Sequence, residues 1–221
     1  MVLAEVGEFT GSVTDRHPTS EVLLRTAVTL LDEHAPDEVT VEMVLSASGV
    51  SKGSLYHHYR DFNELLDQAQ VARFTRLVDA SIARLTRVLT ESRTREECYA
   101  GLVAVTAATQ GPATVASRSL RVWTLGQASL RPSMREALGL EQQRLTDALS
   151  DLVRAAQSKG WFRADLDPAV VAVFIQAYTL GKAVDDVTPS RVDPAAWQRL
   201  VNTVIASVFM GDPGLLDGGP A

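Results

Sequence analysis

The sequence predicts an all-α fold with three short helices followed by six longer ones. Apolar residues recur every three or four positions nearly throughout the chain, as they do on one face of a helix. Strand-like alternation bounded by turn residues never extends over a useful length. The 221 residues, 46% hydrophobic and 22% charged, can bury a sizeable core. Their number fits either one large domain or a small domain and a larger one.

The first three helices are short and closely spaced. A loose arm ends at Pro18, and apolar periodicity then predicts a helix over residues 19–34. Thr40 is a good N-cap for a short second helix, because its hydroxyl can accept a hydrogen bond from a backbone N–H of the first turn. Residues 48–50 form a tight turn, after which Ser51 caps a short third helix.

The six remaining helices are longer. Asp61 caps a helix that keeps one apolar stripe to Glu91, a length of roughly 40 Å at the usual rise per residue. An Asp-Pro pair opens each of the last two helices. The other boundaries follow glycines and prolines and predict helices over 95–109, 113–130, 132–159, 168–184 and 194–210. The predicted organisation is an arm (1–18), a three-helix domain (19–66), a six-helix domain (67–210) and a frayed tail (211–221).

Charge is unevenly distributed over the first domain. The net charge of −6 argues against wholesale electrostatic binding of nucleic acid. The stretch 43–60 nevertheless contains no acid and holds Lys52, Arg60 and the pair His57 and His58. Such a local clearing of negative charge is what a phosphate-facing surface needs.

The second and third helices predict a helix-turn-helix, because a glycine turn joins them and the third helix is polar. Small and hydrogen-bonding side chains on that helix let it enter the major groove, and Gly53 permits a close approach to the duplex. Tyr56 and the histidines can donate to phosphate oxygens, and Thr40 can bring its hydroxyl to another phosphate. The candidate DNA-binding residues are Thr40, Ser51, Lys52, Gly53, Ser54, Tyr56, His57, His58 and Arg60.

Residues 19–66 resemble the DNA-binding domain of the tetracycline-repressor-like (TetR/AcrR) family of bacterial transcriptional regulators. The resemblance rests on the segments 23–27, 40–41, 48–59 and 65–66, of which VSKGSLYHHY is the most specific. It implies that Tyr56 and His58 contact mainly phosphates. The family usually has a lysine where this chain has Phe62, so Arg60 or Asn63 is expected to replace that phosphate contact. Glu42 stands where a basic or neutral residue is common, and Ala35 replaces a usual glycine.

The last two helices predict a dimer. Residues 169–178 are apolar on all sides except for Gln176, and such a helix must be covered all round. A second subunit is the simplest cover, and the family pairs these two helices with their twins. A symmetric dimer implies a pseudo-palindromic double-stranded DNA operator. The predicted interface residues are Val170, Phe174, Tyr178, Trp197, Leu200, Val204 and Val208.

Helices four to seven are expected to enclose a ligand pocket for a largely apolar small-molecule effector. The resemblance implies that the effector releases a repressor from its operator by shifting the dimer between two geometries. Ordinary core packing explains each residue, taken singly, at least as well. The candidate pocket residues are Phe74, Tyr99, Thr106, Gln110, Trp123, Gln127 and Met134.

Other functional classes find little support. The adjacent histidines point about 100° apart on a helix and have no third ligand at a useful spacing, so we expect no metal. Cys98, the single cysteine, is expected to be a small buried residue rather than a redox sensor. The chain has no grouping of a nucleophile with a base and no phosphate-cradling glycine loop, so we expect neither an enzyme nor a cofactor.

The N-terminus lacks a secretory signal, and no apolar run is long enough to span a membrane. With a single cysteine, these features predict a soluble cytoplasmic protein without a membrane partner. Two alternatives remain. One is a helical small-molecule-binding protein or enzyme that does not bind DNA. The other is a degenerate family member that acts through a protein partner, which Phe62, Glu42 and the acidic balance favour.

Overall fold

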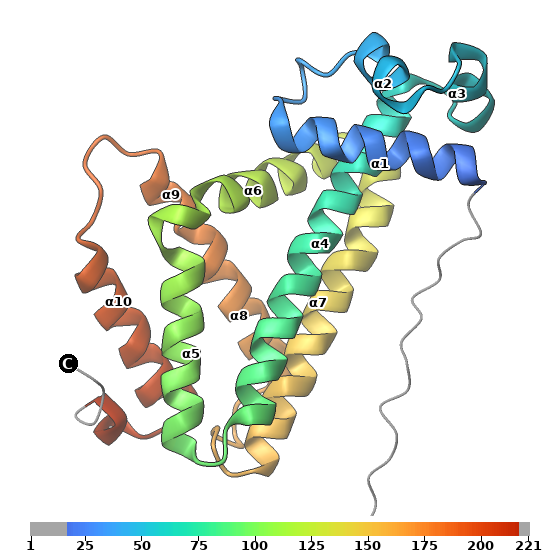
Figure 1. Cartoon of the computed structure of the whole chain (residues 1–221). Helices are drawn as coiled ribbons and strands as arrows, with labels where there is room; N and C mark the ends of the chain where they lie inside the picture. Colours follow the sequence, from blue (N-terminus) through green and yellow to red (C-terminus); the bar gives the residue numbers. More distant parts are fainter. Residues whose placement is uncertain (1–16, 217–221) are drawn as a thin grey trace, which may run out of the picture. The chain divides into compact units, whose positions relative to one another are not determined.

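A computed structural model describes residues 17–216, and these residues form helices joined by turns, with no strand among them (Figure 1). The predicted all-α fold is confirmed. The chain divides into two compact units, Met1–Ala72 and Arg73–Ala221. Most of the predicted arm and the last five residues of the predicted tail lie outside the described residues.

The smaller unit contains three complete helices and the first turns of a fourth. Thr40 and Ser51 cap the second and third helices as predicted, since each hydroxyl accepts a hydrogen bond from a backbone N–H of the first turn. Gly49 ends the second helix with a φ of +68°, a left-handed conformation that residues with a Cβ rarely adopt. The helices are α1 (Pro18–Glu33), α2 (Val41–Ser48), α3 (Lys52–His58) and α4 (Phe62–Glu91), the last of which continues into the larger unit.

One apolar core holds the smaller unit together. Leu23 of α1, Val44 of α2, Leu55 of α3 and Leu65 of α4 are all completely buried in it. Tyr59, at the end of α3, is also buried, and its hydroxyl donates to the carbonyl oxygen of Ser20 at 2.9 Å. Tyr59 is thus a core residue and not part of the exposed side of α3.

The larger unit begins within α4. Asp167 and Asp193 each cap a helix that starts with proline, as predicted, and the Asp167 carboxylate accepts from the N–H groups of Ala169 and Val170 at 2.8 and 3.0 Å. Its helices are α5 (Arg95–Gln110), α6 (Val115–Leu130), α7 (Pro132–Ser158), α8 (Pro168–Gly181), α9 (Ala183–Asp186) and α10 (Pro194–Thr203). Two 3-10 turns, at Pro112–Thr114 and Pro213–Leu216, and a π-helical segment at Val204–Phe209 complete it.

The predicted helix over 168–184 is in fact two helices, α8 and α9. Gly181 has low helix propensity, and the next residue, Lys182, turns inward. Its ammonium group pairs with Asp185 and lies 5.5 Å from the ring centre of Trp197. The predicted helix over 194–210 also changes character, because α10 is followed by the π-helical segment.

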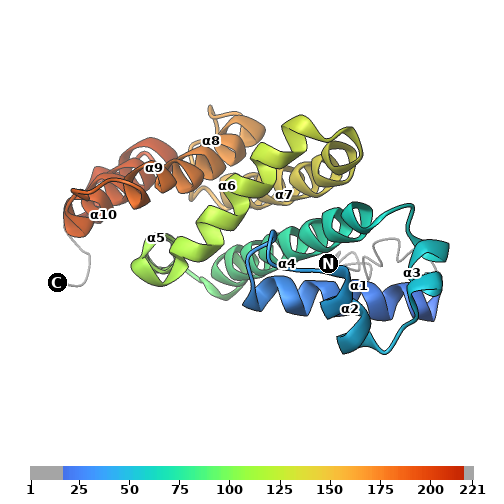
Figure 2. The same ribbon diagram turned by 90° about the horizontal axis from the view of Figure 1, so that it is seen from above.

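The helices α8, α9 and α10 lie along one side of the larger unit (Figure 2). A single core joins α8 and α10 to α5 and α7, with Tyr99, Val153, Val171, Val201 and Phe209 as buried contributors from different elements. The last two helices of the prediction therefore share a core with the rest of the larger unit.

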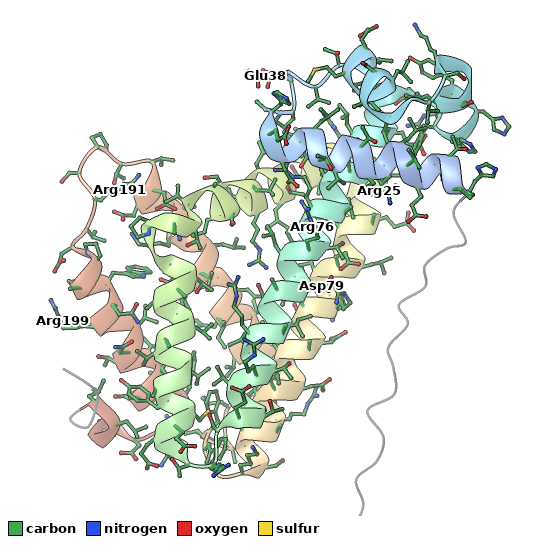
Figure 3. The ribbon with its side chains drawn as sticks, in the orientation of Figure 1. Arg25, Glu38, Arg76, Asp79, Arg191 and Arg199 are labelled. Atoms are coloured by element: carbon green, nitrogen blue, oxygen red, sulfur yellow. The ribbon has the colours of Figure 1, made fainter. Side chains whose placement is uncertain are left out.

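Two ion pairs tie elements of the larger unit to one another. The Arg118 guanidinium of α6 donates to both carboxylate oxygens of Asp186 of α9, at 2.7 and 2.8 Å, and both side chains are about 5% exposed. Arg144 of α7 donates to Asp79 of α4, labelled in Figure 3, at 2.7 Å. The first pair is buried and the second is partly exposed, so the first contributes far more to specifying the fold.

Candidate DNA-binding face and candidate ligand cavity

The helix α3 has one buried side and one exposed side. Leu55 fixes the buried side in the core, while Lys52, Gly53, Tyr56 and His57 are exposed. Ser54 and His58 are partly exposed. We call the exposed part of α3, with the flanking residues Thr40, Ser51 and Arg60, the reading face. The structure thus brings all nine candidate DNA-binding residues to elements of one unit and buries none of them.

The hydroxyls of the reading face are already engaged at the helix starts. The Thr40 hydroxyl accepts from the N–H of Met43 at 3.3 Å. The Ser51 hydroxyl accepts from the N–H of Ser54 at 3.2 Å and lies 3.0 Å from the Ser54 hydroxyl. These caps hold the start of each helix in place, and each hydroxyl keeps further capacity to contact a phosphate.

Gly53 has no neighbour that requires a glycine. A Cβ at this position would meet only the Ser51 hydroxyl oxygen, at 4.0 Å, and the backbone is helical. Since nothing in the protein fills the space, the missing side chain leaves room on the outer side of α3. This is the geometry that a close approach to another molecule requires.

Three imidazole rings gather beside α3. The His58 ring stacks on that of His17, with ring centres 4.8 Å apart, and His57 lies edge-on to His58 at 5.1 Å. Loss of hydration, and then the nearby His17 and His57, lower the pKa of His58. His58 is therefore neutral at pH 7, and its ring is a hydrogen-bond donor or acceptor rather than a cation.

Arg60 lies next to a carboxylate. Its guanidinium Nε is 3.2 Å from an oxygen of Asp61, which caps α4 by accepting from the N–H of Glu64 at 2.8 Å. That backbone hydrogen bond, and then the Arg60 side chain, lower the pKa of Asp61. Phe62 packs on the core of the smaller unit, and Glu42 is exposed in the first turn of α2, where it complements the helix dipole.

The predicted interface residues separate into two groups. Tyr178, Trp197 and Val204 pack against the core of their own subunit. The remaining four are strongly exposed, although apolar: Val170 (67%), Phe174 (48%), Leu200 (59%) and Val208 (45%). With Val173 these four form an exposed apolar face on α8, α10 and the π-helical segment, which we call the α8–α10 face. Arg199, also exposed, projects outward from α10 (Figure 3).

A cavity of about 150 Å³ lies within the larger unit. Elements α4 to α8 and the π-helical segment supply its walls. Much of the lining is apolar, and Gln176 reaches it from α8, where its amide donates to Thr146 at 3.1 Å. The lining includes Leu77, Leu85, Leu102, Leu145, Leu149, Phe162, Ile175 and Phe209 as apolar residues and Arg84, Thr106, Arg118, Arg121, Gln142, Gln176 and Tyr178 as polar ones.

The cavity lining differs from the predicted one, since only Thr106 of the seven candidate residues takes part. Phe74, Met134 and Tyr99 are buried in side-chain packing instead. Gln110 accepts a hydrogen bond from the Trp197 ring nitrogen. Trp123 is 37% exposed, and Gln127 is partly exposed. Six of the seven candidate residues therefore lie outside the lining of this cavity.

Arg118 and Arg121 were not among the predicted pocket residues, although the sequence contains a signal for them. No Asp or Glu occurs between Glu97 and Glu136, a long acid-free stretch in an acidic chain. Arginines one helical turn apart within such a stretch indicate that positive charge is needed there. Both of these arginines line the cavity.

Three features bear on the alternative functions. Cys98 is buried, and burial raises the pKa of its thiol to about 11, which keeps it protonated and unreactive. Residues 17–216 include no group of three or more His, Cys, Asp or Glu side chains that could hold a metal ion. None of the helices in that range is long and apolar enough to cross a membrane.

Comparisons with known proteins agree with this architecture. The model of bacterial regulatory proteins of the tetR family matches residues 23–69, and that of the C-terminal part of BetI-type transcriptional repressors matches residues 102–210. The transcriptional regulator AcuR of Cereibacter sphaeroides is 32% identical over 171 residues, which cover 72% of this chain and 70% of AcuR.

Solved structures show the same fold at lower identity. One is described as a transcriptional regulator from Saccharomonospora viridis in complex with choline, with a TM-score of 0.62 and 20% identity over 86% of this chain and 96% of that one. Another is FadR from Bacillus subtilis in complex with stearoyl-CoA, with a TM-score of 0.57 and 15% identity over 85% of this chain and 97% of FadR.

The helix-turn-helix, the all-helical larger unit and these matches define a DNA-binding regulator of transcription. The chain belongs to the TetR family of bacterial transcriptional regulators.

Proposed function

We propose that the chain is a homodimeric transcriptional repressor that binds a pseudo-palindromic operator and is released from it by a small-molecule effector. The observation that carries this proposal is the exposed α3, which follows a glycine-ended α2 in a member of the TetR family. A helix with one buried side and one polar, exposed side is suited to enter a major groove.

The reading face would divide its contacts between phosphates and bases. Thr40, Tyr56, the two histidines and Arg60 are suited to phosphates, because they lie around α3 and present donors. Ser51, Lys52 and Ser54 are suited to the groove itself, where Gly53 allows the helix backbone to come close to the bases. Lys52 and Arg60 are exposed and carry permanent positive charge at neutral pH, so they are expected to contribute to salt-dependent affinity.

The α8–α10 face supports the dimer. Val170, Phe174, Leu200 and Val208 would be covered by the same residues of a second copy, as a two-fold interface requires. A two-fold dimer presents two copies of α3, so the operator half-sites should lie about 34–36 Å apart or a simple multiple of that distance.

The cavity of the larger unit is the proposed effector site. Ligands occupy relatives of the same fold, choline in the Saccharomonospora viridis protein and stearoyl-CoA in FadR. An effector that favours one dimer geometry over another would weaken operator binding through a coupling of roughly 1–3 kcal/mol. We assign the protein no catalytic role and place it in the cytoplasm, where transcription occurs.

A mobility-shift assay with the DNA upstream of the protein's own gene tests this function. We expect saturable binding at low salt with two protomers per duplex, and Tyr56→Phe should weaken it, because the variant loses only the phenolic hydroxyl proposed to bind phosphate. Arg135→Gln, an exposed substitution on α7, serves as the control and should bind as the natural chain does.

Absence of saturable binding at low salt would remove the repressor function. It would then favour a family member that acts through a protein partner, a possibility to which the buried packing of Phe62 and the exposed Glu42 contribute.

A further inference from the structure

Arg121 of α6 is a charged residue at the cavity without a charged partner. It lines the cavity, and its guanidinium carbon lies 5.7 Å from the ring centre of Phe74. Within residues 17–216 the structure gives it neither an ion pair nor a hydrogen bond; the contact with Phe74 is its one specific interaction there. A cation–π contact of this kind uses none of the guanidinium N–H donors, so these donors remain available to other partners.

The neighbouring arginine behaves in the opposite way. Arg118, one turn earlier on α6, donates to Asp186 through two nitrogens and to the Thr109 carbonyl and the Thr114 hydroxyl through a third. Its charge is neutralised and its donors are used. The contrast between two arginines on the same helix indicates that Arg121 serves a purpose other than holding the helices together.

The charged residues that line the cavity are all positive. Its lining includes Arg84, Arg118 and Arg121 but no Asp or Glu. Asp186 pairs with Arg118 alone among the cavity arginines, so the cavity retains two positive charges, one exposed at Arg84 and one partly buried at Arg121. A cavity of this charge attracts anions and disfavours cations.

Burial makes the lone charge of Arg121 costly. Loss of hydration lowers the pKa of its guanidinium, yet an arginine remains protonated at any physiological pH. A buried cation is stabilised when an anion with matching hydrogen-bond geometry pairs with it. A carboxylate fits this fork, because its two oxygens can accept two parallel N–H donors.

The rest of the lining limits the remainder of such a ligand. Leucine and aromatic side chains from α4, α5 and α7, among them Leu77, Leu102 and Leu145, offer an apolar surface. A volume of about 150 Å³ is comparable to an engineered protein cavity that holds benzene, so the apolar part is about the size of one aromatic ring or a short alkyl chain.

We propose that the cavity binds a small monocarboxylate with an apolar body, whose carboxylate pairs with Arg121 while the body packs against the leucines. Its role as effector rests on the proposed repressor function, but its binding to the free protein does not. Phe74, whose ring centre lies 5.7 Å from the guanidinium carbon, would act as a positioning residue.

Isothermal titration of the full chain without DNA tests this proposal. The probes are benzoate and hexanoate, each compared with its uncharged amide of nearly the same shape. We expect both carboxylates to bind the natural chain at least about tenfold more tightly than their amides, because hydrogen bonds to charged groups exceed neutral ones by this order. Arg121→Gln should abolish the preference, and Arg121→Lys should keep part of it, since a lysine retains the charge without the planar fork.

Arg135→Gln again serves as the control and should keep the full preference, with circular dichroism showing that each variant is folded. The comparison of carboxylate and amide on the natural chain needs no variant. Equal affinity for both, no binding of either carboxylate, or a preference that survives in folded Arg121→Gln would overturn the proposal. If carboxylates bind through Arg121 but do not release operator DNA, the binding site stands and its effector role fails.

Discussion

Two stretches of this acidic chain, residues 43–60 and residues 98–135, contain no Asp or Glu, and the structure uses them in opposite ways. The first presents Lys52 and Arg60 to the outside of the smaller unit. The second turns Arg118 and Arg121 inward, to a cavity of the larger unit. The same compositional signal thus accompanies the proposed DNA-binding surface in one case and the proposed carboxylate site in the other. Burial decides which of the two applies.

The sharpest test of this comparison separates the two arginines of the second stretch. We expect Arg118→Leu to lower the free energy of unfolding by about 3–5 kcal/mol, because it leaves the buried Asp186 carboxylate without its partner. Arg121→Leu removes a buried charge that has no ion pair, so it should be neutral or stabilising. Urea unfolding followed by circular dichroism measures both, and equal losses would show that Arg121 is also structural.

The pH dependence of the free energy of unfolding tests the Arg118–Asp186 pair. The Arg118 hydrogen bond lowers the pKa of the Asp186 carboxyl in the folded state. A carboxyl with a lowered folded pKa stabilises the protein above its unfolded pKa, about 3.9, and this contribution is lost as the pH falls through the folded value. The difference in stability between the natural chain and Asp186→Asn should therefore be full near pH 7 and shrink below about pH 4.

A substitution in the first stretch, residues 43–60, is expected to have a smaller effect, which falls on operator binding. Arg60→Ala should weaken operator binding and reduce the slope of log affinity against log salt by about 0.9, the amount for one phosphate contact. Arg121→Leu, in the second stretch, should leave that slope unchanged when no effector is present. Mobility shifts at four or five salt concentrations give the slopes. A change of slope in Arg121→Leu would mean that the two stretches are not separate in function.

The smallest expected effect concerns Gly53. Because a Cβ there would meet only the Ser51 hydroxyl at 4.0 Å, Gly53→Ala should raise the free energy of unfolding, by up to about 1 kcal/mol. The same methyl group would stand between α3 and the bases, so operator affinity should fall. Thermal unfolding and a mobility shift on one preparation measure the two. If affinity is unchanged, α3 does not approach DNA closely at this position.

Local chemistry explains which parts of the fold were predictable. The caps at Thr40, Ser51, Asp167 and Asp193 were predicted correctly, because a cap depends on a side chain and the backbone two or three residues away. The break between α8 and α9 was not predicted, since it depends on Lys182 reaching Trp197, a contact between separate elements.

The cavity lining shows more clearly which features could not be predicted from the sequence. Phe74 and Met134 were correctly expected to point inward, but whether an inward residue meets a void or another side chain depends on how distant helices pack. Only Thr106 was in both the predicted and the observed lining. The acid-free stretch around Arg121 would have predicted the cavity residues better, because the distribution of charge can be determined from the sequence and the packing of distant helices cannot.

The different roles of Arg118 and Arg121 on α6 bear on how the ligand preference of such a protein can change in evolution. One turn of the helix carries Arg118, whose guanidinium pairs α6 with α9. The next turn carries Arg121, which lines the cavity and is the proposed ligand-binding residue. Chemical preference can therefore drift at Arg121 while Arg118 keeps the scaffold intact. A single substitution at Arg121, in evolution or in the design of a biosensor, is therefore expected to change the preference of the proposed site from carboxylates to neutral molecules.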